Sequence, residues 1–422
     1  MQASDSYPTG IDNNGSVSVH GEMLIDNPVA IDFYLSEMSV SDRHGGGLTL
    51  QRVLASDLNR IGKFIHVHRF AQEFPPVPGI VKRCIDLPDW LSSDQARWMF
   101  GCRPTNWLSR QLPVMRMHAR TVSRTFHRLF KGRDRLTAIV CPQSPLSVIC
   151  IEELKNKLRL DYITWVMDDH AIRFRSGHWY YPAGFRQLMQ QHLEDARAVL
   201  VISPAMADLY HEQFGIRGEV LFSPADACPE PVWTSPSNDG TSRIAYFGRV
   251  WGWQSDALQK TAAALSPTTA VLDIFTTESD IPEGLRCSRI RVRPAVPGNL
   301  VAQAMRGYDA VLVPISFEDE FRNLTELNIA TKMSECLGSG TITLVVGPSS
   351  AAMVKFLAPT GAAYIVTDPT TVVLSRAITN IRQPLVRRRI LTAAKQLVTT
   401  QLLTAHMRSK WDAALSLLAV EK

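Results

Sequence analysis

Short apolar runs alternate with amphipathic stretches along most of this 422-residue chain. Residues 136–141 (LTAIVC) and 198–203 (AVLVIS) are two such runs, and each precedes a stretch with apolar residues at helical spacing. Buried strands of a parallel sheet give nearly continuous apolar runs, and the connecting helices cover both faces of the sheet. The first half therefore predicts strands at residues 30–35, 64–68, 136–141, 162–167, 198–203 and 219–222, and helices from about residue 49 and over residues 145–159, 185–196 and 204–214.

A polar stretch interrupts this alternation near the middle of the chain. Residues 225–242 (ADACPEPVWTSPSNDGTS) are dense in Pro, Ser and Asp, which is typical of a linker between domains. A chain of this length also exceeds what one compact core usually holds. After the linker, the sequence predicts strands at residues 243–247, 271–276, 290–292, 310–314 and 342–346, and helices over residues 299–306, 326–337 and 371–418.

The sequence thus predicts an α/β protein with two Rossmann-like, doubly wound lobes and a cleft between them. Ligands of such sheets bind beyond the carboxyl ends of the strands, so the cleft is the expected site. A tail rich in Ser, Gly and Asn is expected to be disordered. We expect this tail at residues 1–27 and the first lobe at residues 28–235. The second lobe is expected at residues 241–400, and a final helix at residues 401–422.

Composition narrows the class of protein. The net charge is +5, with 45 basic and 40 acidic residues, which is too small an excess to indicate a dedicated nucleic-acid-binding protein. No apolar run approaches the ~20 residues that span a bilayer, and the polar N-terminal residues lack a signal-peptide pattern. Seven cysteines without CxxC spacing favour a reducing compartment. We therefore expect a cytoplasmic protein, with peripheral contact to the inner face of a membrane as an open alternative.

Two strand ends in the first half carry candidate binding groups. Gly46 and Gly47 precede a predicted helix, where glycine lets backbone N–H groups approach a phosphate at the helix N-terminus. A flexible loop without a ligand explains this pattern equally well. Asp168, Asp169 and His170 follow a predicted strand, where they could bind sugar hydroxyls or transfer a proton. A helix-capping aspartate pair with an exposed histidine is the alternative, and no metal is predicted because the sequence identifies no third ligand.

The second half offers a cation and a carboxylate in comparable places. Arg249 follows the predicted strand at residues 243–247, where its guanidinium could clamp a diphosphate. Lys332 and Glu335 are three positions apart, so they share one face of a predicted helix. A neighbouring cation and carboxylate suit the phosphates and ribose hydroxyls of a nucleotide sugar. The alternatives are a surface arginine and an ordinary intrahelical ion pair worth ~0.3 kcal/mol.

The stretch between residues 103 and 135 is strongly basic and has helical periodicity. Its apolar stripe consists of Met115, Ala119, Val122, Phe126 and Leu129. The arginines that recur at helical spacing are Arg116, Arg120, Arg124 and Arg128. Such a helix either lies on anionic lipid headgroups or turns its apolar stripe to the core and its basic side to solvent. Nucleic-acid binding is disfavoured because no zinc pattern or RNA-binding signature accompanies it.

Four segments of the chain combine into a known pattern. Residues 196–226 (ARAVLVISPAMADLYHEQFGIRGEVLFSPAD) contain a strand ending in Ser, a helix, and a strand that leads to a Pro turn and Asp. Residues 244–250 (IAYFGRV) form a short strand, and YDAVLVPISFEDE is followed by TKMSECLGSGTITLVVG within residues 308–347. LLTAHMRSKWDAALSLL is a closing helix. From about residue 30 to 418, this combination resembles glycosyltransferase family 4, the group 1 transferases with the GT-B fold.

The resemblance implies a hexosyltransferase-like enzyme that moves a sugar from a nucleotide-sugar donor to a polysaccharide, lipid-linked or other acceptor. A role in polysaccharide biosynthesis of the cell envelope would follow. It further implies that the transfer retains the anomeric configuration and needs no metal or other cofactor. The closing helix would cross back towards the first lobe. Cations and N–H dipoles would stabilise the departing diphosphate, an effect worth ~3 kcal/mol of barrier.

The resemblance also gives roles to the candidate residues. Glu335 would bind the ribose of the donor, and Lys332 and Arg249 would lie near its diphosphate. The remaining residues that it implies for the donor site are Gly46, Gly47 and Glu326. The residues that would face the reacting sugar are Asp168, Asp169 and His170.

The sequence departs from the family at positions that bear on chemistry. Leu327 stands where the first of two glutamates is frequent, with Glu326 one position away, and Gln254 stands where a lysine is frequent. A catalytically inactive GT-B module that binds a nucleotide sugar, or a partner subunit, is therefore the alternative function. An epimerase is a third hypothesis. A phosphorylase is disfavoured, because it would need a pyridoxal-phosphate lysine and a much longer chain.

Overall fold

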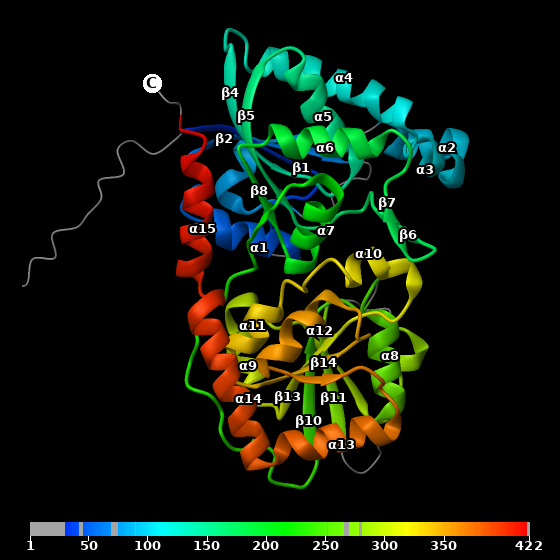
Figure 1. Ribbon diagram of the computed structural model, residues 1–422. Helices are drawn as coiled ribbons and strands as arrows, with labels where there is room; N and C mark the ends of the chain where they lie inside the picture. Colours follow the sequence, from blue (N-terminus) through cyan, green and yellow to red (C-terminus); the bar gives the residue numbers. More distant parts are fainter. Residues whose placement is uncertain are drawn as a thin grey trace, which may run out of the picture.

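The computed structural model describes residues 30–41, 45–68, 75–88, 90–250, 252–265, 270–277 and 281–419. Two α/β lobes lie one above the other in Figure 1, each built on a parallel sheet. The fold class predicted from the sequence is therefore confirmed. The predicted tail at residues 1–27 lies outside the described residues.

The first lobe contains a parallel sheet with the order β3-β2-β1-β4-β5-β8-β9 in the described residues. Its strands are β1 (Ile31–Ser36), β2 (Ile61–His68), β3 (Cys84–Pro88), β4 (Arg135–Cys141), β5 (Arg159–Val166), β8 (Ala198–Val201) and β9 (Glu219–Val220). The apolar run of β1 is buried, and Tyr34 lies in register with Phe64 on one side and Ile139 on the other. Every strand predicted in this half is present. The edge strand β3 was not predicted, because its side chains are mostly half-exposed and give a weak apolar pattern.

Two helices of the first lobe, α5 (Pro145–Lys155) and α7 (Pro204–Phe214), begin at serine side chains that cap them. The other helices described in this lobe are α1 (Gly45–Leu54), α2 (Asp94–Phe100), α3 (Cys102–Leu108), α4 (Leu112–Leu129) and α6 (Phe185–Asp195). The Ser144 and Ser203 hydroxyls accept the N–H groups of Leu146 and Met206, and a proline follows each serine at the first helical position. α1 begins at Gly45 and not near residue 49, so the predicted glycine loop is the first turn of a helix.

Helix α4 turns its apolar stripe to the core. Met115, Ala119, Val122 and Phe126 are buried, and only Leu129 of the predicted stripe is exposed. Its arginines are exposed, and the helix itself runs along the top of the molecule in Figure 1. The core-facing interpretation of this helix is therefore confirmed, and its stripe is not free to contact lipid.

The second lobe contains a parallel sheet with the order β12-β11-β10-β13-β14-β15 in the described residues. Its strands are β10 (Ser242–Phe247), β11 (Ala270–Thr276), β12 (Ile290–Pro294), β13 (Ala310–Pro314), β14 (Ile342–Val346) and β15 (Tyr364–Val366). Its helices are α8 (Ser255–Ala264), α9 (Val301–Met305), α10 (Arg322–Thr325), α11 (Met333–Gly338), α12 (Ala352–Leu357), α13 (Thr371–Arg382) and α14 (Pro384–Leu397). The first sheet ends at Val220 and the second begins at Ser242, on either side of the predicted linker.

Two helix predictions in this lobe are wrong in detail. Residues 326–332 are not helical, and α11 begins only at Met333. The carbonyl of Leu327 accepts a hydrogen bond from the Ser203 hydroxyl in the first lobe, which a helix over residues 326–337 would use internally. Asn299 does not cap a helix either, because it lies inside the 3-10 turn Gly298–Leu300 that precedes α9.

The C-terminal part of the chain runs along both lobes. After α14, a π-helical turn (Val398–Leu402) and an extended Leu403 break the predicted continuous helix, and α15 (Thr404–Ser416) then lies against the first lobe. The buried indole of Trp411 donates to Asp57 Oδ2 at 3.0 Å, and Arg408 Nη1 lies 2.6 Å from the same oxygen. The expected crossing of the final helix to the first lobe is thereby confirmed.

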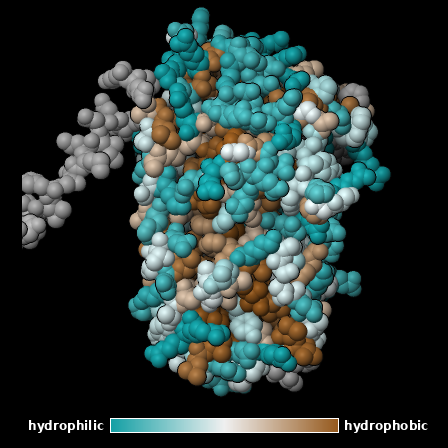
Figure 2. All heavy atoms as spheres, in the orientation of Figure 1, coloured by the Kyte–Doolittle hydropathy of each residue, from teal (hydrophilic) through white to brown (hydrophobic). Residues whose placement is uncertain are grey.

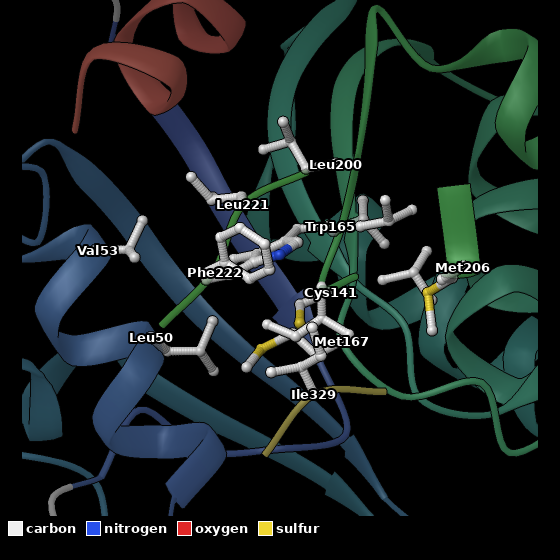
Figure 3. Close-up of a cluster of buried hydrophobic side chains, with 14 of the residues drawn as sticks. Leu50, Val53, Cys141, Trp165, Met167, Leu200, Met206, Leu221, Phe222 and Ile329 are labelled. Atoms are coloured by element: carbon white, nitrogen blue, oxygen red, sulfur yellow. The ribbon is translucent and has the colours of Figure 1, made fainter. Parts of the chain in front are cut away.

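The core of the first lobe continues into residues of the second. Figure 3 shows side chains from α1, from the sheet and from α7 converging on one cluster, with Ile329 of the second lobe at its edge. Leu327 and Ala330 are buried in the same cluster. The segment between β13 and α11 is therefore part of the packing between the lobes.

Candidate functional site

The carboxyl ends of the two sheets face each other across the junction of the lobes. Asn328 Nδ2 donates to Asp168 Oδ1 at 2.5 Å, just beyond the end of β5. Asn323 Nδ2 donates to the Asp169 carbonyl at 3.1 Å. The segment at residues 318–332 of the second lobe therefore lies directly on the strand ends that carry the predicted reactive residues of the first.

Gly46 and Gly47 lie in the first turn of α1, close to this junction. The neighbouring Gly45 is in contact with Thr331, because a Cβ at Gly45 would collide with the Thr331 hydroxyl. The N-terminal N–H groups of α1 therefore lie beside the second lobe. A helix N-terminus generally favours an anionic ligand, and phosphate binding by Gly46 and Gly47 stays a prediction.

Asp169 has a structural role, which corrects its prediction as a reactive group. Its Oδ1 accepts the N–H groups of Ala171 and Ile172 at 3.0 and 3.1 Å. Its Oδ2 accepts the hydroxyls of Tyr181 and Tyr210 at 2.6 and 3.0 Å. Burial, with the Asp169 carboxylate beside them, raises the pKa of both tyrosines well above the usual value. All of these groups are buried, so Asp169 is not presented to a substrate.

Asp168 and His170 are placed differently from Asp169. The Asp168 carboxyl is half-buried and bonds to Asn328 of the other lobe. Burial raises the pKa of Asp168 above its ordinary value, and the nearby Asp169 adds to this, while His170 opposes it. His170 is exposed, and its backbone N–H donates to the Gln143 carbonyl at 3.0 Å. Of the three predicted residues, Asp168 is the carboxyl that the structure holds between the lobes.

Lys332 lies beneath the turn that carries Arg249. Its Nζ donates to the Phe247 carbonyl at 2.5 Å and lies 4.5 Å from the centroid of the Tyr246 ring. Gly248 has a φ of 148°, which favours glycine, and a Cβ there would displace that Nζ. The Tyr246 hydroxyl donates to the Arg249 carbonyl, and the Arg249 side chain is exposed. The predicted lysine and the turn that carries the predicted arginine therefore meet at the carboxyl end of β10.

Glu335 faces the first lobe, where a cation meets it. Arg52 on α1 lies 3.3 Å from Glu335 Oε1 and 3.3 Å from Asp226 Oδ2. The Glu335 side chain is only 16% exposed, so this contact is partly shielded from solvent. Arg52 was not predicted, and no local pattern could identify it, because 283 positions separate it from Glu335.

Glu326 is engaged within its own segment, and its role as a donor ligand stays a prediction. Its Oε1 lies 3.0 Å from Arg322 Nε. The Arg322 guanidinium lies 4.3 Å from the Phe174 ring centroid, on the hairpin of β6 (Arg173–Arg175) and β7 (His178–Tyr180). Glu326 therefore orients an arginine that packs on the first lobe. The neighbouring position 327 holds a buried leucine instead of a carboxylate.

Comparison with known proteins shows similarity to solved structures but not to family models or curated sequences. No protein-family model and no curated protein sequence matches the chain. Among solved structures, HepE from Anabaena in complex with UDP and glucose is similar, with a TM-score of 0.61, 13% identity, and coverage of 92% of this chain and 99% of HepE. Sucrose-phosphate synthase from Thermosynechococcus elongatus gives a TM-score of 0.61 and 14% identity over 92% and 99% of the two chains. WaaG, a glycosyltransferase involved in lipopolysaccharide biosynthesis, gives 0.56 and 12% over 90% and 99%.

The chain has the GT-B fold. In GT-B terms, α1 and the end of β5 belong to the first lobe, and β10, α11 and the segment at residues 318–332 belong to the second. Lys332, Glu335 and Asp168 all lie at the junction of the two GT-B lobes. In the described parts of the chain, no three His, Cys, Asp or Glu side chains gather into a metal-binding group.

A separate groove lies on the second GT-B lobe. It has a volume of about 670 Å³, and none of the predicted site residues lines it. Its lining residues are Lys260, Ala263, Ala264, Phe317, Thr367, Asp368, Pro369, Thr370 and Thr371. Because the chemistry-bearing groups meet at the junction of the lobes instead, we locate the candidate site at that junction.

Proposed function

We propose that this protein is a glycosyltransferase that binds a nucleotide-sugar donor between its GT-B lobes. The observation that carries the proposal is the start of α11. There Lys332 reaches the turn that carries Arg249, and Glu335 faces the N-terminal lobe. A cation and a carboxylate one helical turn apart suit the two polar parts of a nucleoside diphosphate.

In the proposed complex, each residue contacts a definite part of the donor. Glu335 accepts the ribose hydroxyls, and Lys332 and Arg249 neutralise the diphosphate. The N-terminus of α1 faces the same phosphates from the other lobe. HepE has been solved with UDP and with UDP-glucose, which makes a UDP-linked hexose the first donor to test.

The proposed reaction transfers the sugar without a metal or other cofactor and with retention at the anomeric carbon. The bond between C1 and the diphosphate oxygen breaks, and the diphosphate keeps the electron pair. The acceptor oxygen then bonds to C1 and loses its proton. Asp168 is the proposed group for that proton or for a sugar hydroxyl, because its carboxyl lies at the junction and its pKa is raised. The proposed acceptor is a glycan or a lipid-linked sugar.

Donor binding by matched carboxylate variants tests the proposal. Glu335→Gln should weaken binding of the best UDP-sugar by roughly 10- to 100-fold, the loss of one charged hydrogen-bonding partner. Glu326→Gln is the control, because this nearby carboxylate pairs with Arg322 and should leave the affinity within about twofold of wild type. Calorimetry and thermal shift measure both. If Glu335→Gln binds every tested donor as wild type does, the proposed site is wrong.

A catalytically inactive GT-B module is the second candidate. Leu327 is buried at a position where the family often has a glutamate. Glu335 forms an ion pair with Arg52, so its carboxylate already has a partner within the protein. Release of nucleoside diphosphate, measured across donors and acceptors, separates the two functions. Donor binding without release under any condition would favour the inactive module.

A further inference from the structure

Several large apolar side chains protrude from the first lobe next to α4. Trp98 is 86% exposed and Trp107 is 64% exposed, whereas indoles usually bury most of their surface. The exposed large apolar residues between positions 90 and 117 are Trp90, Trp98, Met99, Trp107 and Met117. We call these five residues the tryptophan cap. A single exposed apolar residue is ordinary, but several in neighbouring elements indicate an interaction surface.

Consecutive elements carry the tryptophan cap. The 3-10 turn Trp90–Ser92, α2 and α3 contact one another, and α3 leads through a short turn into α4. Figure 1 shows α2 and α3 together at one end of the first lobe, next to the start of α4. The tryptophan cap therefore sits on one corner of the lobe.

The same part of the chain holds an unusual excess of positive charge. Residues 90–133 contain nine Lys or Arg and one Asp, a net charge of +8, while the whole chain has +5. The rest of the protein therefore carries −3. Arg116, Arg120, Arg124 and Arg128 are exposed on α4, and of these only Arg120 has an ion pair that we can identify, with Glu153 at 3.5 Å. Figure 2 shows a mainly hydrophilic surface over the top of the molecule, where α4 lies.

The combination fits the surface of an anionic bilayer. Indoles prefer the headgroup level, where an apolar ring and a polar N–H are both satisfied. Arginines beside them attract anionic headgroups. α4 has 18 residues and is about 27 Å long, so its arginines form a row suited to an extended charged surface. The apolar stripe of α4 is buried, so the insertion must come from the tryptophan cap and not from that stripe.

We propose that the tryptophan cap and the arginines of α4 dock the first lobe on an anionic lipid surface. The indoles enter the headgroup layer, and the arginines contact the headgroup phosphates. Docking in itself does not depend on the transfer reaction. One consequence does rest on the proposed function. If the lobe that carries Asp168 is docked on lipid, a lipid-linked acceptor is favoured over a soluble one.

Vesicle flotation of the full-length protein tests the docking. The probes are vesicles of phosphatidylcholine alone and vesicles with about one third phosphatidylglycerol. Wild type should float with the anionic vesicles, less at physiological than at low salt, and its tryptophan fluorescence should shift to the blue. Trp98→Ser/Trp107→Ser should lower the partition coefficient at least tenfold. Arg116→Gln/Arg124→Gln/Arg128→Gln should lower it roughly a hundredfold, at about fivefold for each arginine.

Matched controls keep the outcome decisive. Trp233→Ser removes an exposed indole of the linker between the sheets, over which Arg388 lies, and should float as wild type does. An unchanged melting temperature and unchanged UDP-sugar binding show that the Trp98/Trp107 variant is folded. Absence of flotation at both salt concentrations overturns the proposal. The proposal is also overturned if the Trp98/Trp107 variant floats as well as wild type does. A third contrary outcome is that wild type forms an oligomer, the variant is monomeric, and neither protein binds vesicles. Failure to bind any donor would refute the proposed function and leave the flotation result unaffected.

Discussion

Asp169 joins the end of β5 to α7 and to the chain on either side of the β6–β7 hairpin. Two backbone N–H groups and two tyrosine hydroxyls use all of its carboxylate oxygens. The adjacent Asp168 meets an asparagine of the other lobe instead. The two neighbouring aspartates therefore have different roles. Asp169 stabilises the first lobe, whereas Asp168 contacts the second lobe at the junction.

Asparagine variants of Asp168 and Asp169 should distinguish these two roles. Asp169→Asn places an amide donor against groups that all donate, so it should lower the free energy of unfolding by about 2–3 kcal/mol. Asp168→Asn should change stability by less than about 1 kcal/mol and lower the turnover at least 100-fold, with donor affinity retained. Urea unfolding and a diphosphate-release assay measure the two effects. Equal activity of Asp168→Asn and wild type would remove Asp168 from the reaction.

Sequence reasoning could place both aspartates at a strand end but could not distinguish them. That position follows from the apolar run of β5, which local spacing reveals. The partners of Asp169 are Tyr181 and Tyr210, which lie 12 and 41 positions away in the sequence. Only the packing of α7 and the hairpin region against β5 brings them to the carboxylate.

His192 makes the first lobe sensitive to acid. It is buried on α6, stacked on Tyr162, with Nε2 2.9 Å from the Thr164 hydroxyl. Burial, and secondarily the charge of Lys155, lowers the pKa of His192 to about 3. The unfolded chain takes up this proton near pH 6.5 and the folded chain does not, so stability falls as pH drops from about 6.5 towards 3.

The matching variant is His192→Gln. Between pH 7 and pH 5 the wild type should lose up to about 1.4 kcal/mol of unfolding free energy per pH unit from this group. His192→Gln should lose correspondingly less over the same interval. Urea unfolding at both pH values measures the difference, and equal slopes for the two proteins would contradict the assignment.

At the scale of elements, the segment before α11 shows where apolar periodicity misleads. Residues 326–337 have helical spacing, yet the first part is irregular because its groups serve the other lobe. Leu327 offers its carbonyl to Ser203, and Asn328 offers its amide to Asp168. The sequence alone contains the apolar residues of this segment but not the surface on which they pack.

Ser203 therefore does more than cap α7. Ser203→Ala should cost about 1–2 kcal/mol through the lost cap, and it also frees the Leu327 carbonyl between the lobes. Ser144→Ala removes the cap of α5 with no contact to the second lobe through that hydroxyl that we can identify, so it is the control. Donor affinity should fall several-fold for Ser203→Ala and stay unchanged for Ser144→Ala. Equal donor affinities in calorimetry would show that this bond does not organise the site.

At the scale of the whole molecule, α15 ties the second lobe to the first. Trp411 is fully buried, with its ring 6.0 Å from that of Trp165 and its N–H on Asp57. Trp411→Ala should lower the free energy of unfolding by about 3–5 kcal/mol. Leu417→Ala, which truncates an exposed side chain of the same region, should stay within about 0.5 kcal/mol. Chemical denaturation compares the two, and a similar small effect of both would show that α15 is not tightly docked.

The two-lobed architecture was predictable because strand and helix alternation is a local signal that restarts after the linker. The contacts that define the site were not, since they join distant parts of the chain. Arg52 and Glu335 are the clearest case, at 283 positions apart. Lys332 and Glu335 could be predicted together because they share one short stretch of sequence, whereas the residues that surround them depend on how the two lobes meet.

The presence of Ile329 in the cluster beneath β5 has a consequence for dissecting this protein. If the chain were cut at the linker, the N-terminal half would lack both Ile329 and Trp411. The places of these side chains would then be apolar cavities open to water. We therefore expect neither half to fold stably on its own, which urea unfolding of the separate halves would check. Produced together, however, the two fragments carry complementary surfaces, so the chain is suited to a split reporter whose signal depends on reassembly.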